Sequence, residues 1–316
     1  MLKKNQEFSK IDKKIILELQ KNGRASYTEL SSAIGINVST AASRTEKLIQ
    51  SRSIEVRAIP NPLKIGLSAN AVIVIQADPS KIDLICEQFI DSFNIATLLT
   101  VFGRYDVLLF VSFPTWELMH DFINGTLSKV EGILKIETFF LKKFVKRYED
   151  IFGNIPHKIE QVKLSEIEWK LIVELTKNGR MNLNEISGKI GVHVSTISRK
   201  LHALLEQEVI KIIAIPNPFK FGYYSNAFMV LEVEATKVDR ICKKLYAHPE
   251  IIVITTLISG SGIIIGIQSW NNETLYKFIK EKIAQINGVM KIETFLTAEL
   301  KKRFYGWLVK EKDLSV

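Results

Sequence analysis

The feature that most constrains this sequence is an internal repeat that runs along nearly its whole length. The string IPNPLKIG at residues 59–66 returns as IPNPFKFG at residues 215–222, an offset of 215 − 59 = 156 residues. KNGR and KIETF also occur twice, each at the same offset. Because the repeats of solenoid proteins have periods of about 20–50 residues, this long and constant offset indicates a duplicated domain or a duplicated pair of domains. The chain of 316 residues therefore holds two equivalent copies.

The charge balance of the chain points to an anionic partner. The net charge is +9 at pH 7 and the sequence pI is about 9.3, while the apolar fraction of 47% is that of a globular protein. Such a basic balance favours nucleic acid, although a solvated, lysine-rich surface would give the same numbers. No segment has the length of a membrane helix, and the start lacks the apolar core of a signal peptide. We expect a cytoplasmic protein with no membrane partner.

The two cysteines, Cys86 and Cys242, also stand 156 residues apart. Each falls in a segment with helical spacing of apolar residues, so we expect buried thiols that pack in equivalent places. Two cysteines do not make a disulfide framework in a chain of this length. The alternative is a reactive or metal-binding thiol.

The first part of each copy, at about residues 10–59 and 164–215, has the apolar spacing of three short helices. In the first copy, glycines end the first two segments, and Asn37 precedes the third. We predict that the side-chain oxygen of Asn37 caps a free backbone N–H of that third helix. Three helices with a tight turn before the third describe a helix-turn-helix domain, of the winged or the plain three-helix kind.

The third helix of each copy, at about residues 38–50 and 194–206, presents polar and basic side chains on its non-apolar face. Side chains of these types contact phosphates and base edges in DNA. The candidate DNA-binding residues are Ser39, Thr40, Ser43, Arg44 and Lys47 in the first copy, and Ser195, Thr196, Ser198, Arg199, Lys200 and His202 in the second. A structural three-helix bundle would show the same apolar pattern, and it is the basic face that favours double-stranded DNA as the partner.

The second part of each copy, at about residues 67–141 and 223–296, alternates between β-branched runs and amphipathic segments in the order β-α-β-β-α-β. This order is typical of a ferredoxin-like domain, so the predicted fold class is α+β, with a helix-turn-helix domain followed by a ferredoxin-like domain in each of two tandem copies. The strands are apolar almost throughout, as in Val72–Ile75 and Val107–Val111. Both faces of each sheet should then be buried, one by helices and the other by the sheet of the second copy.

The predicted domain boundaries follow from these patterns. They are a first helix-turn-helix domain at 1–60, a first ferredoxin-like effector and oligomerisation domain at 61–148, a linker at 149–163, a second helix-turn-helix domain at 164–216 and a second ferredoxin-like domain at 217–316. The IPNP strings lie where one domain gives way to the next. Since proline breaks helices and strands, we interpret these strings as rigid hinges. Residues 142–163 are predicted to form a charged connection that is helical at its start.

Two further strings carry a resemblance to a known family. IGINVSTAASRTEKL at residues 34–48 and TVFGRYDVLLFV at residues 100–111 resemble the recognition helix and the Gly-x-x-Asp hairpin of the Lrp/AsnC family. The members of this family, also called feast/famine regulators, have a helix-turn-helix domain followed by a ferredoxin-like effector domain. The resemblance implies a transcriptional regulator, here as a single-chain pseudo-dimer. It also implies an amino acid or another small metabolite as effector, no cofactor, and tandem chains that assemble into a homo-oligomer.

The hairpin at residues 103–106 is the effector site that the resemblance implies. The candidate effector-binding residues are Val101, Gly103, Arg104, Tyr105, Asp106 and, on the last strand, Thr138. Free backbone N–H groups and Arg104 would receive an α-carboxylate, and Asp106 would receive an α-amino group. The alternative is a plain hairpin turn in which Asp106 caps local backbone donors. In the second copy SGSG at residues 259–262 replaces GRYD, so we expect one competent and one degenerate site, or a second loop with room for a different ligand.

The recognition helices of the two copies also differ from each other. His193 takes the place of Asn37, and Lys200 takes the place of Arg44. Because arginine and lysine are not equivalent at a bidentate contact, the two halves should prefer related but unequal half-sites. We expect the two helices to enter successive major grooves about one helical turn, roughly 34 Å, apart.

The main alternative function is that of an enzyme. Siroheme decarboxylases are similar in their helix-turn-helix plus ferredoxin-like build, and resemblance to them implies a histidine and a tyrosine near the start of the hairpin. The matching stretches, FNIATLLTVFGRYD and PEIIVITTLISGSG, contain no histidine. The five histidines have no metal-ligand spacing, and no nucleophile–base pair is visible. We therefore predict no catalytic residues, no metal site and no enzymatic activity. A third alternative, an amino-acid sensor that has lost DNA binding, would be favoured if the basic helices were buried.

Overall fold

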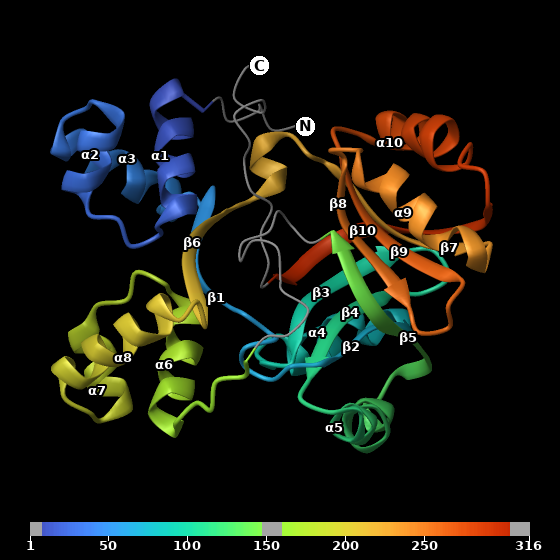
Figure 1. Ribbon diagram of the computed structural model, residues 1–316, viewed down its shortest axis with the longest axis horizontal. Coiled ribbons are helices and arrows are strands. Elements are labelled where there is room, and N and C mark those ends of the chain that lie inside the picture. Colours follow the sequence, from blue (N-terminus) through green and yellow to red (C-terminus); the bar gives the residue numbers. More distant parts are fainter. Residues whose placement is uncertain (1–7, 147–159, 304–316) are drawn as a thin grey trace. The chain divides into compact units, whose positions relative to one another are not determined.

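The structure of the protein is a computed structural model that describes residues 8–146 and 160–303. Its contacts divide into two compact units, and each unit takes one part from each copy. We call residues 8–65 and 160–222 the head unit, and residues 66–146 and 223–303 the barrel unit (Figure 1). The two copies are therefore interleaved, because each domain clusters with its counterpart from the other copy.

The head unit contains two heads of three helices each, as predicted. The first head consists of α1 (Lys10–Lys21), α2 (Tyr27–Ile34) and α3 (Val38–Gln50), and the second consists of α6 (Glu166–Lys177), α7 (Leu183–Ile190) and α8 (Val194–Glu206). A capping box starts α1 and α6, with Ser9 and Ser165 as the N-cap residues. The turn before each third helix begins at Gly35 and Gly191, whose φ angles of 75° and 78° lie in the left-handed region that favours glycine.

The residues that precede the two third helices differ in how they cap them. Asn37 occupies the N-cap position of α3, but its side chain makes no capping hydrogen bond. In the second head, Nδ1 of His193 accepts a hydrogen bond from the backbone N–H of Ser195 at 3.4 Å. The prediction that Asn37 caps its helix was wrong. Asn37 is exposed, so water can satisfy the free backbone N–H groups at this helix end.

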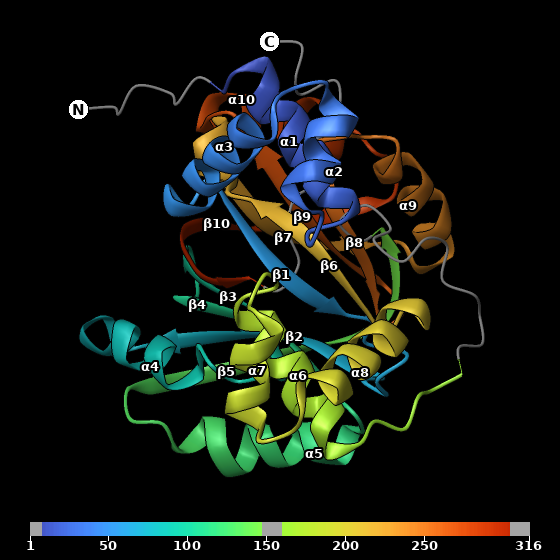
Figure 2. The same ribbon diagram turned by 90° about the vertical axis from the view of Figure 1, so that its left-hand side faces the viewer.

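Each head continues into a strand that the sequence patterns did not predict. β1 (Ile54–Pro60) and β6 (Ile210–Pro216) pair antiparallel along their whole lengths. Figures 1 and 2 show the two strands side by side between the heads. The strand that would serve as a wing therefore pairs with its counterpart in the other copy rather than within its own head.

The IPNP strings belong to this two-stranded ribbon. Pro60 lies opposite Ile210 and ends β1, while Pro216 ends β6 in the same way. Both strands thus end at these prolines, as expected, because a proline cannot donate to the ladder and is tolerated only at the end of an edge strand. The asparagine that follows each proline resumes the pairing. The backbone N–H of Asn61 donates to Val209 O at 2.8 Å, and that of Asn217 donates to Ser53 O at 2.9 Å.

The barrel unit contains the β-α-β-β-α-β order predicted for both copies. The first copy provides β2 (Ala69–Ala77), α4 (Ile82–Phe89), β3 (Ile95–Phe102), β4 (Val107–Phe113), α5 (Trp116–Asp121) and β5 (Ile133–Lys146). The second copy provides β7 (Ser225–Val233), α9 (Val238–Tyr246), β8 (Ile251–Leu257), β9 (Gly262–Ser269), α10 (Asn272–Phe278) and β10 (Val289–Arg303). The strands follow the order β3-β4-β2-β5 in the first copy and β8-β9-β7-β10 in the second.

The last strand of each copy closes the barrel by crossing to the other copy. β5 pairs with β2 up to Phe140 and then with β8 from Leu141 onward. β10 pairs in the same way, first with β7 and then with β3. The result is a closed barrel of eight antiparallel strands, four from each copy. A barrel of this kind leaves no free sheet edge.

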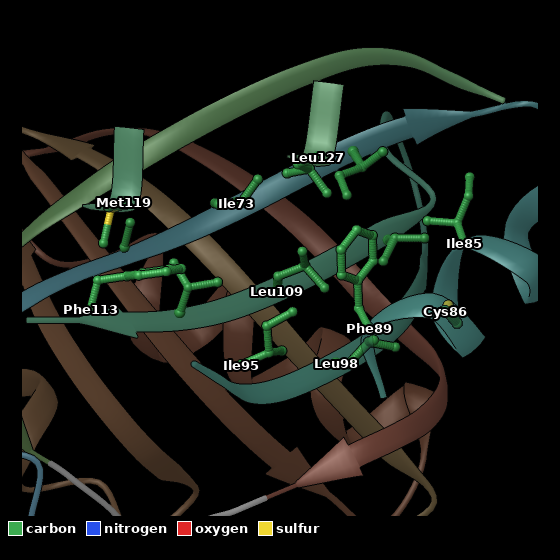
Figure 3. Packing of buried hydrophobic residues seen from close by; sticks show 14 of the residues in the cluster. Ile73, Ile85, Cys86, Phe89, Ile95, Leu98, Leu109, Phe113, Met119 and Leu127 are labelled. Atoms are coloured by element: carbon green, nitrogen blue, oxygen red, sulfur yellow. The ribbon is translucent and has the colours of Figure 1, made fainter. Parts of the chain in front are cut away.

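The two faces of each sheet are both buried, as the apolar strands predicted. On the helix side of the first copy, Ile73 and Leu109 pack against Ile85, Phe89 and Met119 (Figure 3). On the opposite face the two copies share one apolar cluster, which contains Val72, Val74, Leu99, Tyr105 and Leu108 from the first copy and Phe228, Leu257, Ile264 and Phe295 from the second. The prediction that each copy covers the sheet of the other is confirmed.

Lysines near the ends of the two long strands add reciprocal contacts between the copies. Nζ of Lys146 donates to the carbonyl oxygens of Tyr246 and His248, at 3.2 and 2.9 Å, where α9 ends. Nζ of Lys302, at the equivalent position, donates to Ser92 O beyond α4 at 2.7 Å. Each cation thus lies at the C-terminal end of a helix from the other copy, where the helix dipole favours positive charge.

Both cysteines are buried in the barrel unit as free thiols, as predicted. Burial raises the pKa of Cys86 and of Cys242 to about 11. Thiols with so little thiolate at neutral pH are poor nucleophiles, which fits a packing role.

The connection between the copies differs from its prediction where it is described. Residues 142–146 continue β5, so the expectation of a helical start was wrong. Residues 147–159, which include most of the predicted linker, lie outside the described residues. Among the helices that the structure describes, none has the length and apolar character needed to span a bilayer.

Candidate functional site

The third helix of the first head exposes most of its predicted DNA-binding residues. Ser39, Ser43 and Lys47 are exposed, and Thr40 is half-buried. The opposite side of α3 packs into the head through Ala41, Thr45 and Leu48. The polar side of α3 is therefore free to meet a groove of DNA.

The third helix of the second head exposes a more basic surface. Ser195, Ser198, Arg199 and His202 are exposed, and Thr196 is half-buried. His202 lies 3.3 Å from Glu206, one turn further along the helix, and pairs with it when protonated. Arg199 makes no ion pair with any residue that the structure describes, so its guanidinium is available to an outside partner.

Arg44 lies on the edge of α3 that faces the start of α1. Its Nη1 donates to Oδ1 of Asp12 at 3.0 Å and to Oγ of Ser9 at 2.9 Å, and its side chain is 38% exposed. Burial raises the pKa of the Asp12 carboxyl, but hydrogen bonds from Ser9 and Arg44 outweigh it and leave the pKa below its ordinary value. Arg44 therefore ties the third helix to the capping box of the first, and a contact of Arg44 with DNA stays a prediction.

Lys200 makes the equivalent tie in the second head. Its Nζ lies 3.2 Å from Oε1 of Glu168 and 3.2 Å from Oγ of Ser165, and its side chain is 21% exposed. In the second head the shorter Lys200 replaces Arg44, and the longer Glu168 replaces Asp12. The longer acid thus compensates for the shorter base. The sequence pattern assigned Arg44 and Lys200 to DNA, because helical spacing does not show that each base pairs with an acid on the first helix of its own head.

The first hairpin of the barrel unit holds the predicted effector residues, and several of them are part of its framework. Val101 and Tyr105 are buried, and Gly103 has a φ of 138°, which favours glycine. Oδ2 of Asp106 accepts a hydrogen bond from the backbone N–H of Ala77 at 2.8 Å. Asp106 therefore caps a backbone donor, as in the plain-turn alternative, but the donor lies on β2 rather than in the local turn, and one bond does not exhaust the acceptor capacity of the carboxylate.

Arg104 is the member of this hairpin whose charge reaches the surface. Its guanidinium is 51% exposed and lies 3.4 Å from Glu137, on β5, and 3.7 Å from Glu293, on β10. Glu137 also accepts a hydrogen bond from the hydroxyl of Tyr105. Burial and then this hydrogen bond raise the pKa of Tyr105 to about 12. Arg104 thus connects the last strands of both copies.

Sequence reasoning missed the two glutamates that surround Arg104. Glu137 and Glu293 are the third residues of the two KIETF strings, so the repeat itself was the available signal. Thr138, the predicted last-strand residue, follows Glu137 and lies half-buried opposite Ile73. It makes no hydrogen bond through its side chain with the described residues.

The second hairpin keeps the fold of the first without its charged groups. Where the Asp106 carboxylate accepts the N–H of Ala77, the backbone carbonyl of Ser261 accepts the N–H of Val233 at 2.9 Å. A Cβ at Gly262 would come within 2.5 Å of the Leu257 side chain. Leu257 corresponds to Val101 of the first copy, and Gly262 corresponds to Asp106. The larger leucine side chain thus occupies the space that the aspartate side chain takes in the first copy.

A metal centre is not indicated by the described side chains. Within residues 8–146 and 160–303, no three or more His, Cys, Asp or Glu side chains are grouped so that they could hold a metal ion.

Two heads with exposed third helices, together with a barrel built from two α+β halves, define a helix-turn-helix protein with a dimeric barrel in a single chain. Comparison with known families agrees in each part. Residues 8–49 match the AsnC-type helix-turn-helix domain, residues 164–211 match a winged helix-turn-helix DNA-binding domain, and residues 224–310 match the PF0864 C-terminal dimeric alpha+beta barrel domain. The chain belongs to the Lrp/AsnC family, as a tandem duplication of the family's subunit.

Curated relatives of about half this length support the assignment. An uncharacterized HTH-type transcriptional regulator of Pyrococcus horikoshii, PH0140, is 34% identical over 153 residues, which cover 48% of this chain and 96% of the relative. The HTH-type transcriptional regulator FL11 of Pyrococcus furiosus is 32% identical over 140 residues, which cover 44% of this chain and 92% of the relative. One copy of the duplicated chain thus corresponds to one whole relative.

A solved structure matches the duplicated chain over nearly its full length. The siroheme decarboxylase NirDL covers 96% of this chain and 96% of its own, with a TM-score of 0.63 and 14% sequence identity. At this identity the likeness concerns the fold alone.

Proposed function

We propose that this chain is a sequence-specific, DNA-binding transcriptional regulator that acts as a single-chain pseudo-dimer. The observation that carries the proposal is the pair of exposed third helices, α3 and α8, held within one head unit. Lys47 and Arg199 stand exposed on these helices, surrounded by hydroxyl side chains that contact phosphates and base edges in other proteins. The family membership and the names of the relatives support the same function.

The two halves of the operator should be related but unequal. Ser43 on α3 corresponds to Arg199 on α8, because 199 − 43 = 156. An exposed arginine adds a bidentate donor for a guanine or a phosphate, which a serine does not supply. A homodimer of identical subunits reads a palindrome, whereas a fused pair with these differences is suited to an asymmetric site.

The effector of this regulator is proposed to be an amino acid or another small metabolite, bound at the first hairpin. Arg104 supports this, because its guanidinium is partly exposed and its ion pairs with Glu137 and Glu293 exceed 3 Å. A ligand carboxylate would have to compete with the two glutamates for that guanidinium, so we expect modest affinity. The second hairpin has Gly260 at the equivalent position, which leaves one such site in each chain.

The decisive experiment measures binding of the purified chain to the DNA upstream of its own gene. Binding should saturate, discriminate against scrambled DNA, and fall steeply with salt, because phosphate contacts release counterions. The double variant Lys47→Ala/Arg199→Ala should reduce the slope of log affinity against log salt by about one for each lost phosphate contact. Lys129→Ala/Lys280→Ala, which removes two exposed lysines of the barrel unit, is the charge-matched control and should leave the slope unchanged.

Selection of binding sites from a random DNA library covers the case of a distant operator. A selected motif with two unequal halves would support the proposal. If no DNA is bound at low salt by the promoter fragment or by the library, the proposal is wrong.

The enzyme alternative rests on one observation, the full-length likeness of fold to NirDL. One structure of NirDL is a complex with an iron-uroporphyrin III analogue, so titration with an iron tetrapyrrole is the discriminating test. A Soret shift that saturates at one ligand per chain, with decarboxylation under turnover conditions, would favour the enzyme. We expect neither, because the hairpin stretches of this chain contain no histidine.

A further inference from the structure

The KNGR strings are identical in both copies, and both lie at the junction between the two heads. Each string begins at the last residue of the first helix of its head and ends before the second helix. The backbone N–H of Gly23 donates to Ile212 O at 2.7 Å, and the backbone N–H of Gly179 donates to Val56 O at 2.7 Å. The two hydrogen bonds are reciprocal, since each glycine bonds to the ribbon strand of the opposite copy.

The arginines of these strings cross the junction in the same reciprocal way. Nη1 of Arg24 donates to the carbonyl oxygens of Gly179 and Met181, at 2.7 and 3.2 Å. Nη1 of Arg180 donates to those of Gly23 and Ala25, at 2.8 and 3.1 Å. Each guanidinium is therefore hydrogen-bonded to the loop between the first and second helices of the other head.

The glycines leave no room for a larger residue at this junction. A Cβ on Gly23 would lie 2.8 Å from Cγ1 of Val56 and 2.9 Å from Ile212 O. A Cβ on Gly179 would lie 2.8 Å from Cγ2 of Ile212 and 3.0 Å from Arg57 N. Because all of these atoms belong to the paired strands β1 and β6, an added methyl group would have to push a head away from them.

The junction also brings two like charges close together. Burial and then the charge of Arg180 lower the pKa of the Arg24 guanidinium from its ordinary value. If the junction only had to hold the two heads together, apolar side chains would do so without the desolvation of two charged groups. Directed bonds from a rigid, planar guanidinium to specific carbonyl oxygens instead fix an orientation.

We propose that Gly23, Arg24, Gly179 and Arg180, here called the KNGR clasp, fix the distance and orientation between α3 and α8 and thereby set the half-site spacing that the protein accepts. As it concerns DNA half-sites, this inference rests on the proposed function. The clasp residues are positioning residues, since they act through the placement of the two recognition helices. A change in the angle between the heads that moves these loops away from the arginines would break the arginine–carbonyl bonds, because each bonded loop is continuous with a helix of its head.

The functional test is a series of operators in which the spacing of the two selected half-sites is varied in single base pairs. The unaltered protein should prefer one spacing and reject sites shifted by about half a helical turn, or about 5 base pairs. The variant Arg24→Ala/Arg180→Ala should lose about tenfold or more of this discrimination, while its slope of affinity against salt stays the same. Arg24→Lys/Arg180→Lys should recover part of the discrimination, because an ammonium group can still donate to carbonyl oxygens.

The matched control removes the same charge from the same strings. Lys21 and Lys177 are the first residues of the two KNGR strings, and they pair with Glu18 and Glu174 of their own helices. Lys21→Ala/Lys177→Ala should leave the spacing preference intact. If this control and the arginine variant behave alike, the clasp proposal is wrong.

A second measurement tests the clasp without DNA and so separates it from the proposed function. Spin labels at Thr28→Cys and Asn184→Cys, exposed and equivalent positions on α2 and α7, report the distance between the heads. Cys86 and Cys242 are buried, with pKa values raised to about 11, and should not take up label. We expect one narrow distance distribution, which broadens in Arg24→Ala/Arg180→Ala and shifts in Gly23→Ala. An unchanged narrow distribution in both variants would overturn the inference even if the protein binds DNA.

Discussion

In the barrel unit, the first copy places Val72 opposite Phe110 on neighbouring strands, and the second copy places Phe228 opposite Gly266 at the same register. The phenyl ring has moved from one strand to the other, and the pair of the second copy is smaller by the three side-chain carbons of valine. A Cβ on Gly266 would meet Cε1 of Phe228 at 3.3 Å. In the second copy the ring of Phe228 therefore lies over Gly266, where a side chain would crowd it.

The heads show a compensation in charge. Arg44 pairs with Asp12 in the first head, and Lys200 pairs with Glu168 in the second. A shorter base is matched by a longer acid, so the tie between the first and third helices is kept.

The difference between the copies teaches which changes a fused pair tolerates. Contacts within a copy have drifted in compensating pairs, whereas the clasp contacts between the copies are identical on both sides. The pair Arg104 and Gly260 shows no such compensation, because no described residue of the second hairpin supplies a charge in place of that of Arg104. The two copies thus differ in matched pairs within the heads, whereas the charged groups of the first hairpin have no counterpart among the described residues of the second.

The largest effect should come from adding a side chain at Gly266. Gly266→Phe alone would place a second phenyl ring beside Phe228 and should lower the free energy of unfolding by about 3 kcal/mol, the upper end for an overpacked core. The double variant Phe228→Val/Gly266→Phe recreates the pair of the first copy and should recover most of this loss. Chemical denaturation of the single and double variants measures the coupling. Equal destabilisation in both would show that the two residues do not compensate each other.

Exchange of the recognition residues should have the next largest effect. Arg199→Ser should weaken operator binding by about tenfold, or about 1.4 kcal/mol, and Ser43→Arg should strengthen binding at the opposite half-site. The variant that carries both changes should prefer the operator with its two halves exchanged. Binding titrations against the operator and its reversed form measure this preference. The claim of unequal half-sites fails if neither change alters it.

The charge compensation in the heads predicts a dependence of stability on pH. The pKa values of Asp12 and Glu168 both lie below their ordinary values, because hydrogen bonds and the facing bases outweigh burial. A carboxyl whose folded-state pKa is lowered stabilises the protein above its unfolded-state pKa, and this contribution is lost as the pH falls through the folded-state value.

Asp12→Asn/Glu168→Gln should therefore lower the free energy of unfolding at pH 7 by about 1 kcal/mol per head. It should also flatten the loss of stability between about pH 5 and pH 3. Denaturation curves at several pH values test both points. Glu117→Gln is a useful control, since the Glu117 pKa is lowered by local contacts at the start of α5 in the other unit. The same flattening in this control would assign the effect to carboxyl groups in general.

The smallest effect on stability is expected at the divergent hairpin. Arg104→Gly recreates the second copy at this position and removes two long ion pairs of a half-exposed arginine, so the free energy of unfolding should change by less than about 1 kcal/mol. Binding of an amino-acid effector, measured by calorimetry against a panel, should be lost in the same variant. Lys135→Ala, which removes a lysine 3.8 Å from Glu137, should bind nearly as well. Equal loss in both variants would point to the net charge of the surface rather than to Arg104.

Much of the fold could be predicted because it depends on local patterns. The repeat, the three helices of each head and the order of strands and helices in the barrel unit all follow from apolar periodicity and from glycines that end helices. Buried cysteines and two-sided strands were predictable for the same reason. The absence of a capping hydrogen bond from Asn37 could not be predicted, because the same side chain can either cap the helix or face water.

The candidate sites were predictable only as far as single elements go. The exposed side of α3 and α8 follows from helical spacing, but the engagement of Arg44 with Asp12 depends on how the first helix packs against the third. Glu137 and Glu293 lie 33 and 189 residues from Arg104 along the chain. No local pattern relates residues at such separations.

The sequence by itself determined that this protein is a tandem pair of helix-turn-helix and βαββαβ halves with a basic surface on each third helix. Only the tertiary structure decided that the halves interleave, that β1 pairs with β6, and that the KNGR arginines cross between the heads. The physical reason is that helix and strand formation depend on neighbours a few residues apart. The choice of partner depends instead on many weak contacts between surfaces that meet only after those elements have formed.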